Sequence, residues 1–202
     1  MEYREIVDMV NTDPVIQTLM AEPIPIRLAY LGLDGFPRSV PINHVWNGQA
    51  FLFATPNLAY KVKAITANPQ VAFTLDVGAG RPGRETRAKV SALIGPPPAA
   101  FDFAPIAIHG RGLATVELTP GVPQEHIDAS RRMIGDDEKW EEWARVRRAE
   151  TSGMALITIV PTHLVVVDFV TRFPPPSEVN VTAFGADQLD ESTGRVNVAG
   201  RA

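Results

Sequence analysis

The spacing of hydrophobic residues changes near Ile26. Before this point, from Tyr3 to Met20, apolar residues recur at the three- and four-residue intervals of a helix. Asp13-Pro14 divides the stretch, because aspartate suits the position before a helix and proline suits its first turn. The pattern therefore predicts two short helices, followed by strands in which apolar and polar residues alternate.

The first three predicted strands follow one another with tight turns between them. Asp34-Gly35 and Asn47-Gly48 are two-residue signals for β-hairpins. The strands that they separate span Ile26 to Leu33, Arg38 to Trp46 and Ala50 to Thr55. On the second strand, alternation places Val40, Ile42, His44 and Trp46 on one face and Pro41, Asn43 and Val45 on the other. The order predicts a β-meander.

The remaining elements are mainly strands with helices appended. Further helices are expected over Tyr60 to Asn68, Pro123 to Ile134 and Asp137 to Ala149. Further strands are expected over Gln70 to Val77, Ile106 to Leu118, Met154 to Val160 and Leu164 to Phe173. Gly110 and Gly112 allow a bend or bulge in the long strand. Residues 78–105 are typical of a loop insertion, with one strand around Ala88 to Ile94.

Mostly consecutive strands predict an antiparallel barrel, because a doubly wound sheet would alternate strand and helix regularly. No Gly-x-Gly-x-x-Gly follows a strand and no P-loop motif occurs, so neither nucleotide-binding signature is present. We expect one domain over residues 1–173 and a polar, proline-led tail over residues 174–202. The fold class is mainly β with appended helices.

Composition limits the partners more than it limits the fold. The 202 residues carry a net charge of -4, which argues against nucleic acid, because phosphate backbones require clustered cations. The chain has no cysteine, which excludes disulfides and thiolate chemistry. It also has no apolar stretch of about 20 residues and no signal-peptide pattern. We expect a cytoplasmic protein that acts on small molecules and does not insert into membranes.

One stretch offers the elements of a phosphate site. The third strand ends at Thr55, and a short helix then begins with Lys61 and Lys63 in its first turn. Unpaired backbone N–H groups and the helix dipole favour an anion at such a turn. Arg38 begins the neighbouring strand and can approach the same end. The alternative is that both lysines are solvated residues of the helix surface, and spacing alone leaves the two interpretations open.

The segment from Leu28 to Asp76 resembles the pyridoxamine 5'-phosphate oxidase-like superfamily of flavin and deazaflavin split β-barrel proteins. The residues that carry the resemblance are Asp34-Gly35-x-Pro37, Pro41, Asn47-Gly48, Phe51-Leu52-Phe53-Ala54-Thr55, Lys61, Ile65 and Asn68-Pro69-x-Val71-Ala72. The resemblance implies an antiparallel split β-barrel that forms a homodimer and holds its cofactor in a groove between the subunits.

The resemblance also implies where the cofactor would lie. Arg38 through Asn43 would follow the ring and ribityl chain, Ala54 and Thr55 would lie near the phosphate, and Lys61 would bind it. The residues expected at the cofactor are Arg38, Val40, Pro41, Ile42, Asn43, Ala54, Thr55, Tyr60, Lys61 and Lys63. Because the cofactor ring carries the hydride, no catalytic side chain is expected. Backbone N–H groups near Pro41 to Asn43 can hydrogen-bond the ring edge and tune its redox potential.

Two departures from the family pattern bear on the choice of cofactor. Tyr60 stands where flavin members often have an arginine, and Pro105 falls where they have a glutamine. These departures leave room for the branch that binds the deazaflavin coenzyme F420, as well as for FMN. The implied function is an oxidoreductase that transfers hydride to or from a small organic substrate. The alternative is a non-catalytic cofactor carrier or sensor of the same fold.

The other chemistry-bearing residues favour structural roles. The four histidines show no metal-binding spacing. A structural role on its strand face is favoured for His44, and the alternative is a ligand or acid that lines the substrate side of the barrel. His109 and Arg111 alternate on a strand and suit a barrel exterior. Trp140 and Trp143 lie three residues apart and are expected to pack as one helix face. No Gly-x-Ser-x-Gly motif indicates a hydrolase.

Overall fold

The computed structural model describes residues 2–77, 85, 88–89, 92 and 106–168, together with the backbone of 189–190 and 195–196. The chain divides into two compact units, Met1–Thr171 and Arg172–Ala202. In the second unit, β8 (Leu189–Asp190) pairs antiparallel with β9 (Arg195–Val196). All other elements belong to the first unit.

The first unit is built on one antiparallel sheet. Its strands are β1 (Ile26–Leu31), β2 (Pro37–Ile42), β3 (Val45–Trp46), β4 (Phe51–Pro56), β5 (Gln70–Asp76), β6 (Ile106–Pro120) and β7 (Gly153–Asp168). They pair in the order β2-β1-β5-β6-β7-β4-β3. Gly35 and Gly48 have φ of 81° and 92°, the left-handed conformation that the two predicted hairpin turns require.

The sheet closes on itself. β2 and β3 stand at opposite ends of the strand order, yet only Asn43 and His44 separate them along the chain. Three residue steps span at most about 11 Å, so the two ends of the sheet must come together at this joint. Closure by a shared chain segment makes the sheet a barrel that is split where β2 and β3 are not paired. The expected antiparallel barrel with appended helices is confirmed.

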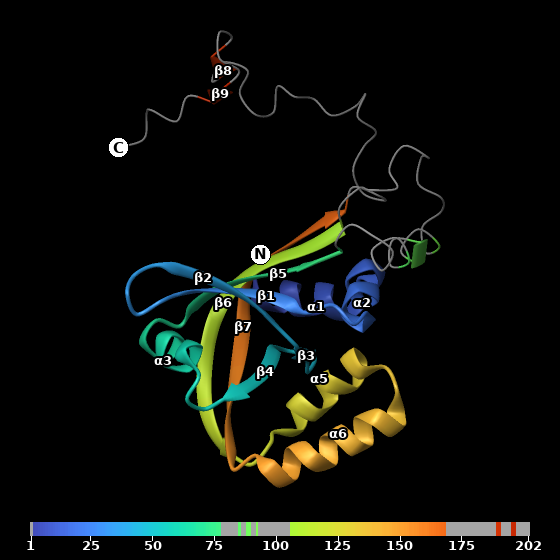
Figure 1. Ribbon diagram of the computed structural model, residues 1–202. Helices are drawn as coiled ribbons and strands as arrows, with labels where there is room; N and C mark the ends of the chain where they lie inside the picture. Colours follow the sequence, from blue (N-terminus) through green and yellow to red (C-terminus); the bar gives the residue numbers. More distant parts are fainter. Residues whose placement is uncertain are drawn as a thin grey trace. The chain divides into compact units, whose positions relative to one another are not determined.

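Helices cover the barrel from different sides. They are α1 (Tyr3–Thr12), α2 (Pro14–Ala21), α3 (Tyr60–Ala67), α5 (Gln124–Ile134) and α6 (Asp137–Glu150). In Figure 1, α3 lies on one side of the long strands β6 and β7, and the other helices lie on the opposite side. Asp13 accepts hydrogen bonds from the N–H groups of Val15 and Ile16, so it caps α2 as predicted.

The core fills the barrel and continues under the first two helices. Phe51 packs between Trp46 and Phe73, with ring centroids 4.8 Å from each. Side chains of α1 and α2 join the same cluster, which includes the fully buried Ile6, Val10, Val15, Ile16 and Leu19. At the β3–β4 hairpin, Tyr3 donates to the Gln49 carbonyl and Asn11 to the Gly48 carbonyl, which fastens α1 to the barrel.

Three sequence expectations are corrected. The strand expected over Arg38 to Trp46 breaks at Asn43 and His44, where the chain leaves one sheet end and joins the other. The strands expected over Met154 to Val160 and Leu164 to Phe173 are one continuous strand, β7, as far as Asp168, and residues 169–173 lie outside the described residues. The strand expected around Ala88 to Ile94 is wrong, because Ala88, Lys89 and Ala92 are helical. Alanine and lysine are strong helix formers, which favours the helical conformation at these positions.

The continuity of β7 depends on a bulge. Arg111 pairs with His163 and Gly112 with Pro161, so Thr162 has no counterpart on β6. A bulge accommodates a proline that would otherwise interrupt a strand. Gly112 is required there, because a Cβ atom at this position would lie 2.3 Å from the Val160 carbonyl oxygen. The expected bulge at the glycines is confirmed.

Candidate functional site

The end of β4 and the start of α3 form a polar corner of the barrel. Thr55 is the last buried residue of β4, and its hydroxyl accepts a hydrogen bond of 3.0 Å from the Lys61 ammonium. The Lys61 side chain is half-buried, and burial lowers its pKa. None of the ion pairs within the described ranges includes Lys61. Its charge is therefore partly desolvated and not neutralised by a carboxylate there.

The first turn of α3 adds further donors to this corner. Ala59 precedes the helix in an extended conformation, and no side chain caps the helix. The first N–H groups of a helix have no intrahelical acceptor, so those of Tyr60 and Lys61 remain available. Lys63 is exposed and lies about 200° around the helix from Lys61. The corner is built by Thr55, Lys61 and the helix start, and Lys63 lies away from it.

Arg38 lies beside Tyr60 and is paired with Asp34. Its two terminal nitrogens contact both carboxylate oxygens of Asp34, at 2.8 and 3.0 Å, and its guanidinium lies 4.6 Å from the centroid of the Tyr60 ring. The hydrogen bond from Arg38 lowers the pKa of Asp34 to about 2. The Tyr60 hydroxyl accepts from the Leu33 N–H at 2.8 Å, so the β1–β2 hairpin is fastened to α3. Asp34 already balances the charge of Arg38.

The residues expected along the cofactor ring differ in whether their side chains face the core of the barrel. Val40 and Ile42 are half-buried and pack against the core, so only their backbone can face a ligand outside the barrel. Pro41 is exposed and Asn43 is half-buried. Among the described strands, β2 pairs with β1 alone, which leaves backbone groups of its other edge open within that part of the chain. Ala54 alternates with Thr55 on β4, so its side chain points away from the corner.

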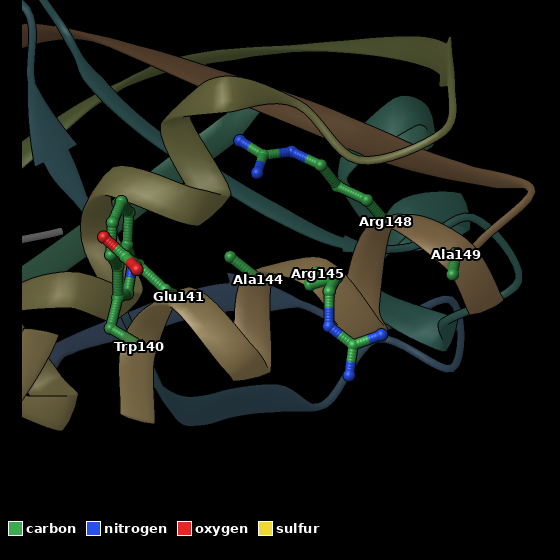
Figure 2. A pocket seen from close by; sticks show the side chains of 6 residues that line it. All are labelled: Trp140, Glu141, Ala144, Arg145, Arg148 and Ala149. Carbon is green, nitrogen blue, oxygen red and sulfur yellow. The ribbon is translucent and has the colours of Figure 1, made fainter. Parts of the chain in front are cut away.

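Three shallow grooves formed by described residues are lined by none of the residues expected at the cofactor. Two of about 400 and 560 Å³ share Ala29 and Ala72 on the outer face of the sheet. The third, of about 600 Å³, runs along α6 (Figure 2). Its two arginines already have partners, since Arg145 pairs with Glu142 and Arg148 donates to Gln124. This groove therefore offers little to an anionic cofactor.

The histidines and tryptophans take structural positions. His44 is 1% exposed, and neither ring nitrogen has a hydrogen-bond partner in the described structure. Burial, with the nearby charge of Arg132, lowers its pKa to about 3. His109 is exposed on the barrel exterior, as expected, and contacts the Thr74 hydroxyl at 3.1 Å. The Trp140 indole donates to the Ile127 carbonyl, and Trp143 packs on His126, so both tryptophans join α6 to α5.

Sequence reasoning missed Arg132. This α5 residue donates to the Met20 carbonyl at 2.8 Å and to the His44 carbonyl at 2.7 Å. It therefore joins three segments that are distant in sequence. One signal could have indicated it, because Arg132 lies three residues after Ala129 and so shares the buried face of the helix.

The geometry defines a class of protein: a split β-barrel with a basic, hydroxyl-bearing corner at the start of a helix. The structure is similar to that of an F420 reductase, with a TM-score of 0.50 and 18% identity over 74% of this chain and 94% of that one. This likeness concerns the fold alone, and it agrees with the mainly β fold with appended helices that the sequence predicts.

Two further solved structures show weaker likeness. One is a protein from Listeria innocua assigned as a pyridoxamine 5'-phosphate oxidase, with a TM-score of 0.45 and 16% identity over 77% of this chain and 96% of that one. The other is a heme storage protein from Vibrio cholerae, with a TM-score of 0.47 and 15% identity over 76% of this chain and 93% of that one. No family model and no curated protein sequence matches the chain. No helix within the described ranges is long and apolar enough to cross a membrane.

Proposed function

We propose that the protein is a flavin-type oxidoreductase that binds FMN or the deazaflavin F420 and transfers hydride to or from a small organic substrate. One observation carries the proposal: the Lys61 ammonium is half-buried, bonded to the Thr55 hydroxyl, and outside every ion pair of the described residues. A cation in this state favours an anion, because partial burial weakens its hydration and no carboxylate competes nearby.

The residues of the corner suit a phosphate monoester. Lys61 has three N–H donors, and Thr55 occupies one of them. Lys61 belongs to the uncapped first turn of α3, so its charge and the helix dipole favour an anion at the same end of the helix. Arg38 adds little net positive charge to the corner, because its guanidinium is paired with the Asp34 carboxylate. We assign the cofactor phosphate to Thr55, Lys61 and the first turn of α3.

The open edge of β2 suits the remainder of the cofactor. Backbone groups between Pro41 and Asn43 can hydrogen-bond the edge of a flat ring, while Val40 and Ile42 hold the strand against the core. When bound, the flavin or deazaflavin ring supplies the hydride chemistry, and the chain supplies orientation and electrostatics. The side chains of this strand need not take part in proton transfer.

A second copy of the chain would complete the groove. The outer face of the sheet exposes large apolar side chains, namely Leu31, Leu113, Val160 and Val165. Exposed apolar side chains on one face favour a protein interface, and isologous dimers are the commonest homo-oligomers. We propose a homodimer that covers this face and places a cofactor between the subunits.

Titration tests the proposal. The purified chain should bind FMN or F420 with micromolar or better affinity, measured by the change in cofactor fluorescence. Binding followed by turnover of a reduced cofactor with an organic acceptor supports an enzyme, whereas tight binding without turnover supports a carrier or sensor. Absence of binding for both cofactors at high micromolar concentration would refute the redox function.

A further inference from the structure

The joint between β2 and β3 is not fixed by strand pairing. The β1–β2 ladder ends at Ile42 and the β3–β4 ladder begins at Val45, so Asn43 and His44 have no partner strand among the described residues. Both sheet ends nevertheless depend on this joint for their position. Some other contact must therefore hold the joint in place.

Arg132 makes that contact. Its Nη2 atom donates to the His44 carbonyl at 2.7 Å, and its Nη1 atom donates to the Met20 carbonyl at the end of α2, at 2.8 Å. Hydrogen bonds from a guanidinium are stronger than neutral ones, and its planar fork fixes the relative orientation of the two acceptors. The His44 ring is buried beside Phe51, with centroids 6.0 Å apart, so the joint is held through both its backbone and its side chain.

We propose that Arg132 is a positioning residue for the cofactor groove, setting the place of the Pro41–Asn43 backbone through its bond to the His44 carbonyl. The proposal rests on the proposed function, because Pro41–Asn43 is the stretch assigned there to the edge of the ring. Arg132 itself lies on α5 and contacts the residue that follows this stretch. Its influence passes through one backbone carbonyl and requires no contact with the cofactor.

Arg132→Met and Arg132→Lys test the inference, with Arg131→Met as the matched control. Arg131 is the neighbouring arginine, but it is exposed and bonded to Asp137 at 3.0 Å. Hydrogen exchange of the amides of residues 42–46 should become about 10- to 100-fold faster in Arg132→Met, the factor for losing the charge-assisted hydrogen bond to the His44 carbonyl, which is the one of its two bonds that holds the joint. The control should exchange as wild type, and Arg132→Lys, which keeps one donor cation, should fall between.

A spectroscopic readout separates positioning from simple stability. In Arg132→Met the absorbance and fluorescence of bound cofactor should shift, because the backbone at the ring edge has moved, and Arg132→Lys should restore part of the wild-type spectrum. Unchanged exchange at residues 42–46 overturns the inference whatever the wild type binds. Faster exchange with an unchanged spectrum of bound cofactor also overturns it. Failure of the wild type to bind either cofactor overturns the proposed function, and this is observed before any variant is made.

Discussion

Acid should destabilise the protein through His44 more than through any exposed histidine. The ring is 1% exposed, has no hydrogen-bond partner in the described structure and lies near the positive charge of Arg132. Burial first, and Arg132 second, lower its pKa to about 3, against about 6.5 in the unfolded chain. The folded state therefore requires a neutral imidazole.

The sign and size of the effect follow from linkage. Because the folded pKa is depressed, the unfolded chain binds the proton more readily below pH 6.5, so stability is full above that pH and is lost as pH falls toward 3. At pH 5 the unfolded histidine is almost fully protonated and the folded one is not. Through His44, the free energy of unfolding at pH 5 is therefore lower than at pH 8 by about 2 kcal/mol. This figure hardly depends on the pKa of His44 in the folded state.

Urea unfolding at pH 8 and pH 5 measures this difference. His44→Leu replaces the ring by an apolar side chain that cannot titrate, so its loss of stability between the two pH values should be smaller than that of wild type by about 2 kcal/mol. His126 also has a pKa lowered by burial. It is present in both wild type and His44→Leu, so its contribution cancels when the two losses of stability are compared. Equal losses in wild type and His44→Leu would refute the buried, neutral imidazole.

Three further outcomes are expected. Gly112→Ala should destabilise the fold by about 1–3 kcal/mol in a thermal or urea melt, because its Cβ atom would meet the Val160 carbonyl at 2.3 Å, and an unchanged melt would contradict the tight crossing at the bulge. Asp13→Ala should cost about 1 kcal/mol, since it removes the acceptor for two N–H groups of α2, whereas Asp13→Asn should retain most of the stability. Sedimentation should show a species of twice the 22.0 kDa chain mass, and a monomer at every concentration would contradict the proposed homodimer.

Local sequence signals were sufficient for most of the fold. The hairpin glycines Gly35 and Gly48, the Asp13 cap and the bulge glycine Gly112 each impose a backbone geometry that few other residues allow. Such signals act over a few residues, so they can be read without tertiary contacts. The succession of strands along the chain followed from them, but the order in the sheet did not, because the predicted β-meander is broken at Asn43 and His44.

The errors arose where distant contacts override local pattern. Alternation continues unbroken from Val40 to Trp46, yet the chain changes its pairing partner at Asn43 and His44 because the barrel closes there. The expected strands stop at Val160 and resume at Leu164, on either side of Pro161, but a bulge keeps β7 continuous. Sequence likewise could not show that Asp34 neutralises Arg38, nor that Arg132 reaches a carbonyl 88 residues away.

The most direct test of the account is the cofactor affinity of Lys61→Ala beside Lys63→Ala. The two lysines lie on one helix, but only Lys61 is half-buried and bonded to Thr55. Losing a charge-assisted hydrogen bond should weaken binding of FMN or F420 by about 10- to 100-fold in Lys61→Ala and flatten its salt dependence. Lys63→Ala should bind as wild type, and both variants should keep the wild-type melting temperature. Equal affinity in wild type, Lys61→Ala and Lys63→Ala would contradict a phosphate site at this corner.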